Sequence, residues 1–164
     1  MDKNYFERMV NKYSATVYRI GLSYLKQKAD AEDVMQEVFI RFLKKNPVFL
    51  CEEHEKAWFI RVCINRCKSF LMLPRFKNEL PLEEQTLSNQ QFCPDEDNGE
   101  VYNAVMALKP KQRICIHLFY YENYSISEIS TLTSMNESTV KSHLRRGKEA
   151  LKNILKGELD YEKI

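Results

Sequence analysis

The residues of this chain that are best suited to chemistry are the cations and hydroxyls between Ser125 and Lys148. Lysine and arginine neutralise phosphates and release counterions, and arginine also pairs bidentately with a guanine edge. Serine reaches phosphates or bases at short range. Such side chains recur at helical spacing on one outer face, which comprises Ser138, Lys141, Ser142, Arg145 and Arg146. The pattern indicates contact with DNA.

Two consecutive helices must position these side chains. Ser125, followed three residues later by Glu128, predicts a capping box at the start of the first helix. After a short break from Ser134, Asn136 predicts the N-cap of the second helix. Apolar residues then recur in a stripe about 100° wide, which is the width of a core-facing side: Val140, Leu144, Leu151, Ile154 and Leu155. The layout is that of a helix-turn-helix, whose second helix enters the major groove through its N-terminal turns.

A basic outer face taken alone is more often a solvated helix surface than a binding site. In this chain the two caps, the short break and the basic face coincide within one stretch. We therefore favour DNA binding over the solvated surface.

The composition of the whole chain indicates a packed, helix-rich protein. Its 164 residues allow one sizeable domain or two small ones, and 44% hydrophobic residues with only 4 Gly and 5 Pro argue against disorder. No apolar signal segment is present, and no apolar stretch approaches the roughly 20 residues of a membrane helix. We expect a cytoplasmic protein with reduced thiols and no membrane insertion.

The residues that most often perform catalysis or hold metals are scattered along the chain. His54, His117 and His143 lie far apart, and neither a glycine-rich phosphate loop nor a nucleophile–base pair stands out. Cys63 and Cys67 stand four apart on one expected helix face, which is compatible with a metal pair. Because two further ligands are lacking, buried thiols are the better account. We expect no enzymatic activity, no cofactor and no metal.

The chain divides into four parts. Residues 1–77 carry almost continuous helical periodicity, and residues 100–156 carry a second helical segment that includes the helix-turn-helix. Between them, residues 78–99 are acidic and punctuated by Pro and Gly, and residues 157–164 form a tail. We expect an all-α fold with two small helical domains joined by a flexible acidic linker. An ordered loop packed on one domain is the alternative for residues 78–99.

Three helices are expected in the first domain. The first carries an apolar stripe from Phe6 to Tyr24, and the third begins near His54 and ends around Pro74. The second begins at Asp30 and ends at Asn46, because the following proline disfavours helical geometry in the residue before it. Its apolar side comprises Val34, Val38, Phe39, Phe42 and Leu43.

The second domain is expected to open with two further helices. A short helix from Val101 to Leu108 is broken at Lys109–Pro110, and another covers Gln112 to Tyr121. Asn123 can adopt the left-handed turn geometry that precedes the helix-turn-helix.

Three motifs resemble bacterial sigma factors. The run DAEDVMQEVFIRF from Asp30 resembles their polymerase-clamp helix, and WFIRVCINRC from Trp58 resembles the promoter-melting helix that follows it. LKPKQR from Leu108, together with VKSHLRR from Val140, resembles their C-terminal domain. The order and compactness of these motifs are similar to the extracytoplasmic-function (ECF) subgroup, which keeps only these two domains.

The resemblance implies a contact between the second helix and the largest subunit of core RNA polymerase. Asp33, Gln36 and Glu37 would present carboxylates and an amide to the coiled-coil clamp of that subunit. For Asp30 and Glu32 a structural role is favoured, since carboxylates near a helix N-terminus complement the macrodipole. Glu37 lies too far into the helix for that role, which favours a contact with a partner.

The resemblance also implies a site for the minus-ten element of promoter DNA. Holding a base outside the stack costs a few kcal/mol, and a pocket returns roughly 1–3 kcal/mol per stacked base. Trp58 is favoured as a core residue rather than a base stacker, and common family members often have a small or polar residue at Cys51, which leaves the preferred base open. The implied residues are Phe49, Leu50 and Cys51 as a capture loop, Asn65 on the flipped base, and Arg61, Arg66 and Lys68 on phosphates.

For the minus-thirty-five element, the matching positions are Lys141, Ser142, Arg145 and Arg146, with Ser138 and Thr139 at the helix entrance. The implied function is a dissociable polymerase subunit that directs promoter-specific initiation, with core RNA polymerase, promoter DNA and an anti-sigma factor as partners. The alternative is a free-standing helix-turn-helix regulator. Such proteins usually dimerise to read two half-sites, and no spare apolar helix for a dimer is evident.

Overall fold

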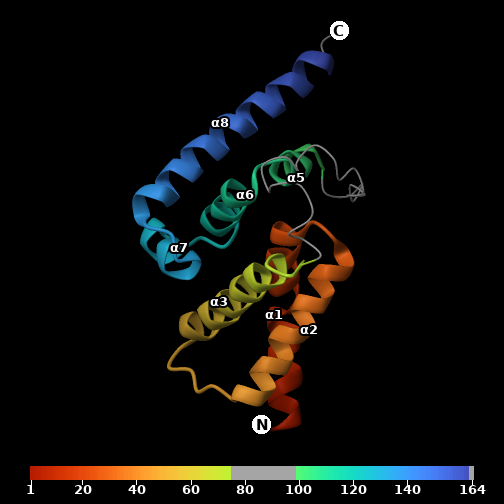
Figure 1. Ribbon diagram of the computed structural model, residues 1–164, viewed down its shortest axis with the longest axis vertical. Coiled ribbons are helices and arrows are strands. Elements are labelled where there is room, and N and C mark those ends of the chain that lie inside the picture. Colours follow the sequence, from red (N-terminus) through yellow and green to blue (C-terminus); the bar gives the residue numbers. More distant parts are fainter. Residues whose placement is uncertain (75–98, 163–164) are drawn as a thin grey trace. The chain divides into compact units, whose positions relative to one another are not determined.

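The computed structural model describes residues 1–74 and 99–162, with side chains up to Gly157. Within these ranges the secondary structure is helical and contains no strand, which confirms the expected all-α fold (Figure 1). The chain forms two compact units, Met1–Asn78 (unit 1) and Glu79–Ile164 (unit 2). The acidic segment expected to be a flexible linker lies almost entirely outside the described residues.

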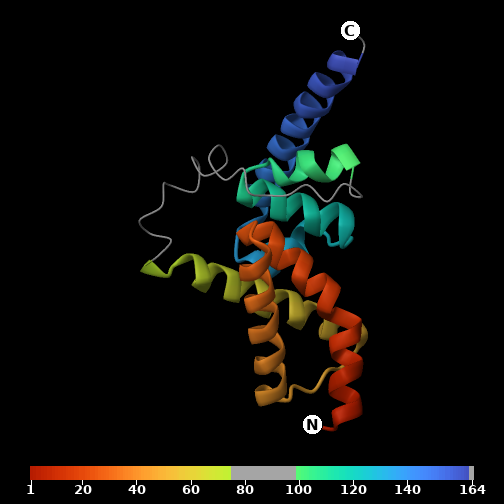
Figure 2. The same ribbon diagram turned by 90° about the vertical axis from the view of Figure 1, so that its right-hand side faces the viewer.

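Unit 1 is a three-helix unit made of α1 (Lys3–Leu25), α2 (Lys28–Lys45) and α3 (Glu52–Leu71). The first two helices run antiparallel, and α3 packs across both of them (Figures 1 and 2). Lys26 and Asn46 take left-handed conformations with φ of 59° and 44°, which end α1 and α2. The second helix starts earlier than expected, since Gln27 is the extended N-cap and Asp30 lies in the first turn.

The core of unit 1 combines aliphatic side chains from all three helices with an aromatic cluster. Gly21 of α1 lies against Ala31 of α2, whose Cα would be 3.4 Å from a Cβ placed on the glycine. Leu43, which the periodicity placed with the core residues, is half exposed because Val38, Phe39 and Phe42 already fill that side of α2. Fully buried residues include Val17, Ile20, Val34, Phe42, Phe59, Ile60 and Ile64.

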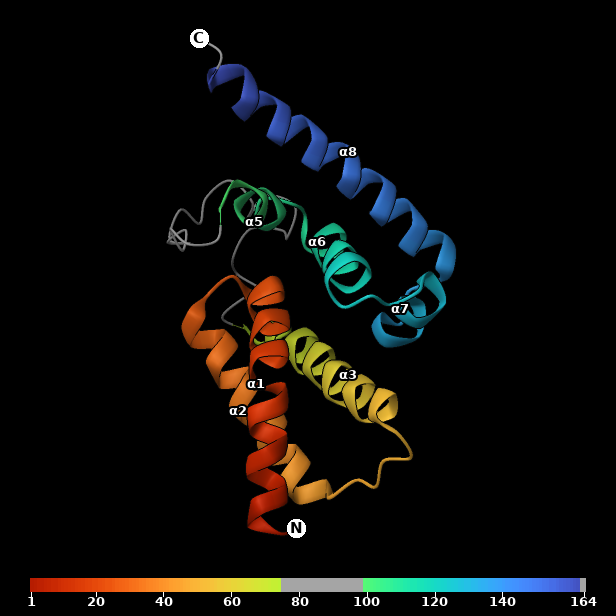
Figure 3. The same ribbon diagram turned by 180° about the vertical axis from the view of Figure 1, so that it is seen from behind.

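Unit 2 is built around one long helix. Its elements are α5 (Gly99–Met106), α6 (Pro110–Ile116), the π-helical turn η2 (His117–Tyr121), α7 (Ile126–Thr133) and α8 (Glu137–Glu162). The helices α5, α6 and α7 each pack against α8 (Figure 3). At Gly147 of α8, an added Cβ would lie 2.9 Å from Cγ1 of Ile116.

A buried arginine joins α6 to the end of α5. Arg113 is only 1% exposed, and its Nη1 donates to the carbonyl oxygens of Met106 at 3.2 Å and Leu108 at 2.9 Å. The first of these carbonyls is at the last residue of α5 and the second lies just beyond it, where intrahelical donors are missing. Pro110 occupies the first turn of α6, where its missing N–H costs nothing. The helix expected from Gln112 therefore starts two residues earlier.

Candidate nucleic-acid interface

The expected capping box at the start of α7 is present. The backbone N–H of Glu128 donates to Oγ of Ser125 at 3.1 Å, and the backbone N–H of Ser125 donates to Oε2 of Glu128 at 2.7 Å. Asn123 before it takes a positive φ of 60°, as its turn position required. The capping-box prediction is confirmed.

The turn between α7 and α8 is fixed by side chains as well as by backbone geometry. Ser134 has a φ of 61°, and the hydroxyl of Ser130 donates to the carbonyl oxygen of Met135 at 2.6 Å. Oδ1 of Asn136 accepts the backbone N–H of Thr139 at 2.8 Å, as expected of an N-cap, and the hydroxyl of Ser138 at 2.9 Å. The turn therefore sets the direction in which α8 leaves α7.

The helix α8 separates a buried side from a polar side as the periodicity predicted. Val140, Leu144 and Gly147 are buried against the rest of unit 2. Nη1 of Arg145 lies 3.6 Å from Oε1 of Glu149, one turn later on the helix. Both side chains are mostly exposed, so this ion pair is weak. Of the sequence-predicted contacts, Ser138, Lys141, Arg145 and Arg146 are exposed, and Thr139 and Ser142 are half-buried.

His143 lies between these contact residues but faces the unit. Burial lowers the pKa of its imidazole below the ordinary 6.5, and the charges of Lys111 and Arg146 lower that pKa further. Its Nδ1 is buried with no hydrogen-bond partner in the described part of the chain. At neutral pH the side chain is therefore uncharged and contributes no cation to the basic face.

The loop between α2 and α3 divides its side chains between the core and solvent. The ring of Phe49 packs inward, with centroids 6.3 Å from Phe42, 5.9 Å from Trp58 and 5.6 Å from His54. By contrast, Val48 is 87% exposed and Leu50 is 91% exposed. Val48 was not among the sequence-predicted residues, although its position beside Phe49 in an apolar run was a usable signal.

Trp58 packs within the same aromatic cluster. Its ring lies 5.1 Å from Phe59 and 5.8 Å from Phe42. This packing agrees with the expected core role. Because Phe49 completes the cluster, its ring anchors the loop to the core, while the side chains of Val48 and Leu50 are exposed.

The helix α3 carries the remaining predicted DNA contacts on two flanks. Arg61, Asn65 and Lys68 are exposed and recur at four- and three-residue spacing, which places them on one face. Arg66 lies on the flank toward α2 and forms an ion pair with Glu37. The structure thus joins two residues to which the sequence assigned separate partners.

The expected polymerase-contact side of α2 is largely accessible. Asp33 and Gln36 are exposed, and Glu37 is partly exposed beside Arg66. Ile40 and Leu43 are each 50% exposed and follow Gln36 at four- and seven-residue spacing, so the side continues as an apolar surface.

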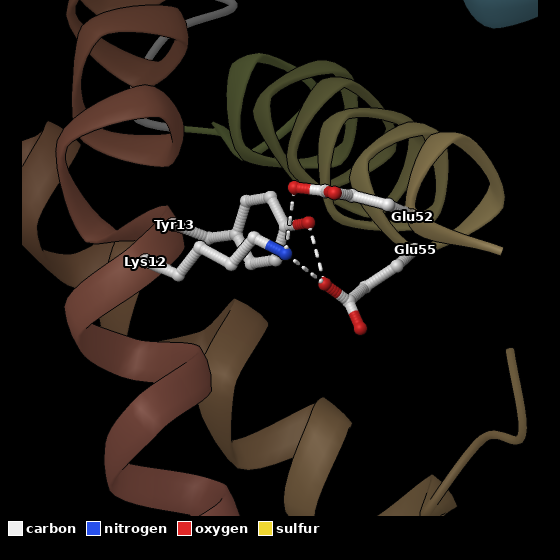
Figure 4. A network of polar contacts seen from close by, with 4 residues as sticks. All are labelled: Lys12, Tyr13, Glu52 and Glu55. Atoms are coloured by element: carbon white, nitrogen blue, oxygen red, sulfur yellow. Dashed lines mark hydrogen bonds and ion pairs between the residues drawn. The ribbon is translucent and has the colours of Figure 1, made fainter.

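A polar network ties the start of α3 to α1 (Figure 4). Oε1 of Glu55 accepts the hydroxyl of Tyr13 at 2.6 Å and Nζ of Lys12 at 2.8 Å, and Lys12 also pairs with Glu52 at 2.9 Å. Burial, followed by the Glu55 hydrogen bond, raises the pKa of Tyr13. Burial alone would raise the pKa of Glu55, yet its bonds from Lys12 and Tyr13 bring it below 4.5. The network holds the helix that directly follows the exposed loop.

The thiols of Cys63 and Cys67 are fully buried, and Sγ of Cys63 donates to the carbonyl oxygen of Val17 at 3.4 Å. The hydrogen bond between the Cys63 and Cys67 thiols, together with burial, raises the pKa of Cys63 well above its ordinary value. In residues 1–74 and 99–157, no group of three or more His, Cys, Asp or Glu could hold a metal ion. No described helix combines the length and apolar character needed to cross a membrane.

Two families of known proteins match the two units. Sigma-70 region 2 matches residues 9–72, and Sigma-70, region 4 matches residues 98–151. The matches together span most of the chain and fall in the order that the motifs predicted.

Curated relatives of similar sequence are ECF RNA polymerase sigma factors. BldN of Streptomyces coelicolor is 28% identical over 92% of this chain, which spans only 60% of that protein. SigX of Bacillus subtilis is 27% identical over 97% of this chain and 89% of its own length. SigL of Mycobacterium tuberculosis is 28% identical over 90% of this chain and 86% of its own length.

The fold is similar to that of a solved sigma-factor structure. It is the sigma factor RpoE in complex with the anti-sigma factor NepR from Bartonella quintana, with a TM-score of 0.69 and 19% sequence identity. The similarity covers 92% of this chain and 96% of that one.

Proposed function

The chain belongs to the ECF subgroup of bacterial sigma factors, the promoter-recognising subunits of RNA polymerase, and we propose how its residues divide that task. Unit 1 binds core polymerase through α2 and opens the minus-ten element with the loop and α3. Unit 2 reads the minus-thirty-five element with α8. The domains run from 1 to 77 and from 100 to 156, with the linker between them.

The observation that carries the proposal is the arrangement at the start of α3. A loop with two almost fully exposed apolar side chains, Val48 and Leu50, leads into a helix face of Arg61, Asn65 and Lys68. Exposed apolar groups can pack on an unstacked base, an amide can hydrogen-bond its edge, and the cations can hold phosphates. Phe49 supports this site by anchoring the loop, while Leu50 and Cys51 face the DNA.

Unit 2 supplies the second contact with DNA. The capped turn presents Ser138 and Thr139 at the entrance of α8 and Lys141, Ser142, Arg145 and Arg146 along its outer side. With polymerase joining the two units, this helix requires no second copy of the chain. The free-standing regulator is for that reason not favoured.

An anti-sigma factor is a further proposed partner. The structurally similar RpoE was crystallised with its anti-sigma factor NepR. Two units joined by a linker can be held by such a partner in an arrangement that hides the polymerase-contact side of α2.

Run-off transcription with purified core polymerase tests the proposed function. We expect specific initiation from a subset of genomic templates only when the full chain is added. If no template gives specific initiation under any salt condition, the sigma assignment fails. Binding of duplex DNA as a dimer without core polymerase would instead support the free-standing regulator.

A charge reversal tests the polymerase contact. Glu37→Lys should weaken binding to core polymerase, because it replaces a carboxylate with a cation at the proposed contact with the polymerase. The affinity is measured by fluorescence polarisation of the labelled chain. Glu32→Lys on the same helix is the matched control and should leave the affinity close to wild type. Equal losses in both variants would remove Glu37 from the polymerase-contact side.

A further inference from the structure

Hydroxyl side chains near the end of α7 bond in two different directions. Thr131 and Thr133 each donate through Oγ1 to the carbonyl oxygen four residues earlier, at 3.2 Å and 2.6 Å. Both bonds stay within the helix, which is the usual pattern for a hydroxyl at a helical position. Ser130 bonds forward, since its Oγ donates to the carbonyl oxygen of Met135, which lies outside the helix, at 2.6 Å. The side chain of Ser130 therefore joins α7 to the chain that follows it.

The bond from Ser130 spans a strained turn. Ser134 lies inside it with a φ of 61°, a left-handed conformation that costs energy in a residue with a Cβ. At the ends of α1 and α2, the left-handed residues Lys26 and Asn46 are held by backbone hydrogen bonds of 2.9 Å to the carbonyl four residues earlier. At the end of α7 a side-chain hydroxyl spans the turn. The bond from Ser130 thus offsets the strain at Ser134.

The carbonyl that Ser130 holds lies next to the N-cap of α8. It belongs to the planar peptide that links Met135 to Asn136. Oδ1 of Asn136 accepts the backbone N–H of Thr139 at 2.8 Å and the hydroxyl of Ser138 at 2.9 Å. A continuous path of hydrogen bonds and one rigid peptide therefore runs from α7 to the entrance of α8, which comprises Ser138 and Thr139.

The later turns of α8 are positioned by other contacts. Leu144 is only 6% exposed, and a Cβ added to Gly147 would lie 2.9 Å from Cγ1 of Ile116 in α6. Arg145 and Arg146 stand between these two buried positions, so the packing of α8 on its neighbours sets their place. The two ends of the proposed DNA-contact side consequently depend on different supports.

We propose that Ser130 is a positioning residue for promoter reading, which acts on the entrance of α8 without touching DNA. The inference rests on the proposed function, in which α8 reads the minus-thirty-five element. Without the hydroxyl, the peptide after Met135 is no longer held, and the side chains at the entrance of α8 sample more than one orientation. Discrimination then falls at the base pairs read by the entrance and is retained at those read from the later turns.

The first test uses the free full-length chain and needs neither DNA nor polymerase. Amide hydrogen exchange at Thr139, followed by NMR, should become about two- to tenfold faster in Ser130→Ala, the change in equilibrium constant that corresponds to one ordinary hydrogen bond. Ser127→Ala removes an exposed hydroxyl from the same helix and should leave that rate unchanged. An unchanged rate at Thr139 in Ser130→Ala overturns the proposal.

The second test uses holoenzyme assembled from core polymerase and each variant. Run-off transcription is measured on the cognate promoter and on templates with single base changes across the minus-thirty-five element. Ser130→Ala should lower discrimination about two- to tenfold at one end of the element, by the same hydrogen-bond limit, and leave the other end unchanged. An equal loss on every template overturns the proposal, because a residue that only stabilises the fold changes the folded fraction for all sequences alike.

Ser134→Gly tests the link between the hydroxyl and the strained turn. Glycine adopts positive φ readily, so in a Ser130→Ala background it should restore part of the exchange protection and of the discrimination. Absence of any restoration overturns the assignment of Ser130 to this turn. If wild-type holoenzyme shows no preference at any base of the minus-thirty-five element, the proposed function fails and the reading role of Ser130 fails with it. The exchange rates of the free chain do not depend on that outcome, so the two failures are distinguishable.

Discussion

Replacing Glu55 with alanine should destabilise unit 1 more than any other single change in its polar network. The carboxylate accepts two hydrogen bonds from α1, at 2.6 Å from Tyr13 and 2.8 Å from Lys12, and its side chain is only 13% exposed. The variant leaves the hydroxyl of Tyr13, a residue that is 3% exposed, without this acceptor. Lys12 retains Glu52 at 2.9 Å, which limits the loss on that side.

The magnitude follows from these contacts. A hydrogen bond to a charged group contributes about 1.5–3 kcal/mol, and an unsatisfied buried hydroxyl costs about 1–3 kcal/mol. Since Lys12 is partly exposed and keeps one partner, most of the loss comes from the Tyr13 side. We expect unfolding of unit 1 to become easier by about 2–3 kcal/mol, which is about 10–20 °C in Tm for a domain of this size.

The Glu55→Ala variant should also change how the stability of unit 1 depends on pH. Because the pKa of Glu55 is lowered in the folded state, its contribution is present above its unfolded value near 4.5 and is lost as pH falls through the folded pKa. The pKa of Lys12 is raised, mainly by its hydrogen bond to Glu55 and next by that to Glu52. The contribution of Lys12 to stability is therefore lost only at strongly alkaline pH. The variant should therefore show a flatter loss of stability on acidification below about pH 4.5.

Thermal unfolding followed by circular dichroism, combined with a double-mutant cycle against Tyr13→Phe, measures the effect. The reasoning requires a coupling energy clearly above the roughly 0.5 kcal/mol scatter of independent sites. Additive single effects, or a Tm within 3 °C of wild type, would refute it. A functional readout is promoter opening by permanganate reactivity, which should fall while the affinity for core polymerase is retained.

The remaining predictions concern unit 2. Gly147→Ala should lower its stability by about 1 kcal/mol in thermal unfolding, because the clash with Ile116 at 2.9 Å outweighs the gain in helix propensity; a stabilised variant would mean that Ile116 moves aside freely. Ser125→Ala should cost about 1 kcal/mol by loss of the capping box, whereas Ser127→Ala in the same turn should cost much less. Since the pKa of His143 is lowered, unit 2 should lose stability as pH falls below 6.5, and His143→Gln should flatten that pH profile. Arg145→Ala should cost about 1–3 kcal/mol on the cognate promoter if it reads a base edge, whereas an equal loss on all sequences would make it a phosphate contact.

Local rules accounted for the helix-turn-helix because its determinants lie within a few residues of each other. The Ser125–Glu128 box and the Asn136 cap are three-residue relationships, and the Val140–Leu144 stripe is a one-turn relationship. Each of these relationships lies within about one helical turn, so the local sequence is enough to predict it. Because the apolar stripe of α8 is buried, the polar residues on the opposite face of the helix must be exposed.

The contacts missed by the sequence are those that depend on where two helices cross. Nothing within α2 or α3 alone pairs Glu37 with Arg66, which are 29 positions apart. The same holds for Glu55, whose partners lie 42 and 43 positions away in α1. Periodicity also places Phe49 in a loop without showing that its ring completes the cluster around Phe42. Its inward packing depends on the space that α3 leaves.

Under the proposed function, the anchored loop implies that a second contact with DNA is needed. Extruding a base costs a few kcal/mol, and the exposed Val48 and Leu50 can return part of that by packing on it. Aliphatic side chains offer less than the 1–3 kcal/mol of an aromatic stack, and the one aromatic ring of the loop, Phe49, is committed to the core. Under the proposed function, the deficit must be supplied by phosphate contacts on α3, by α8 on the minus-thirty-five element, and by polymerase. Promoter opening by this chain is therefore conditional on all three, whereas a sigma factor with an outward aromatic in this loop would depend on them less.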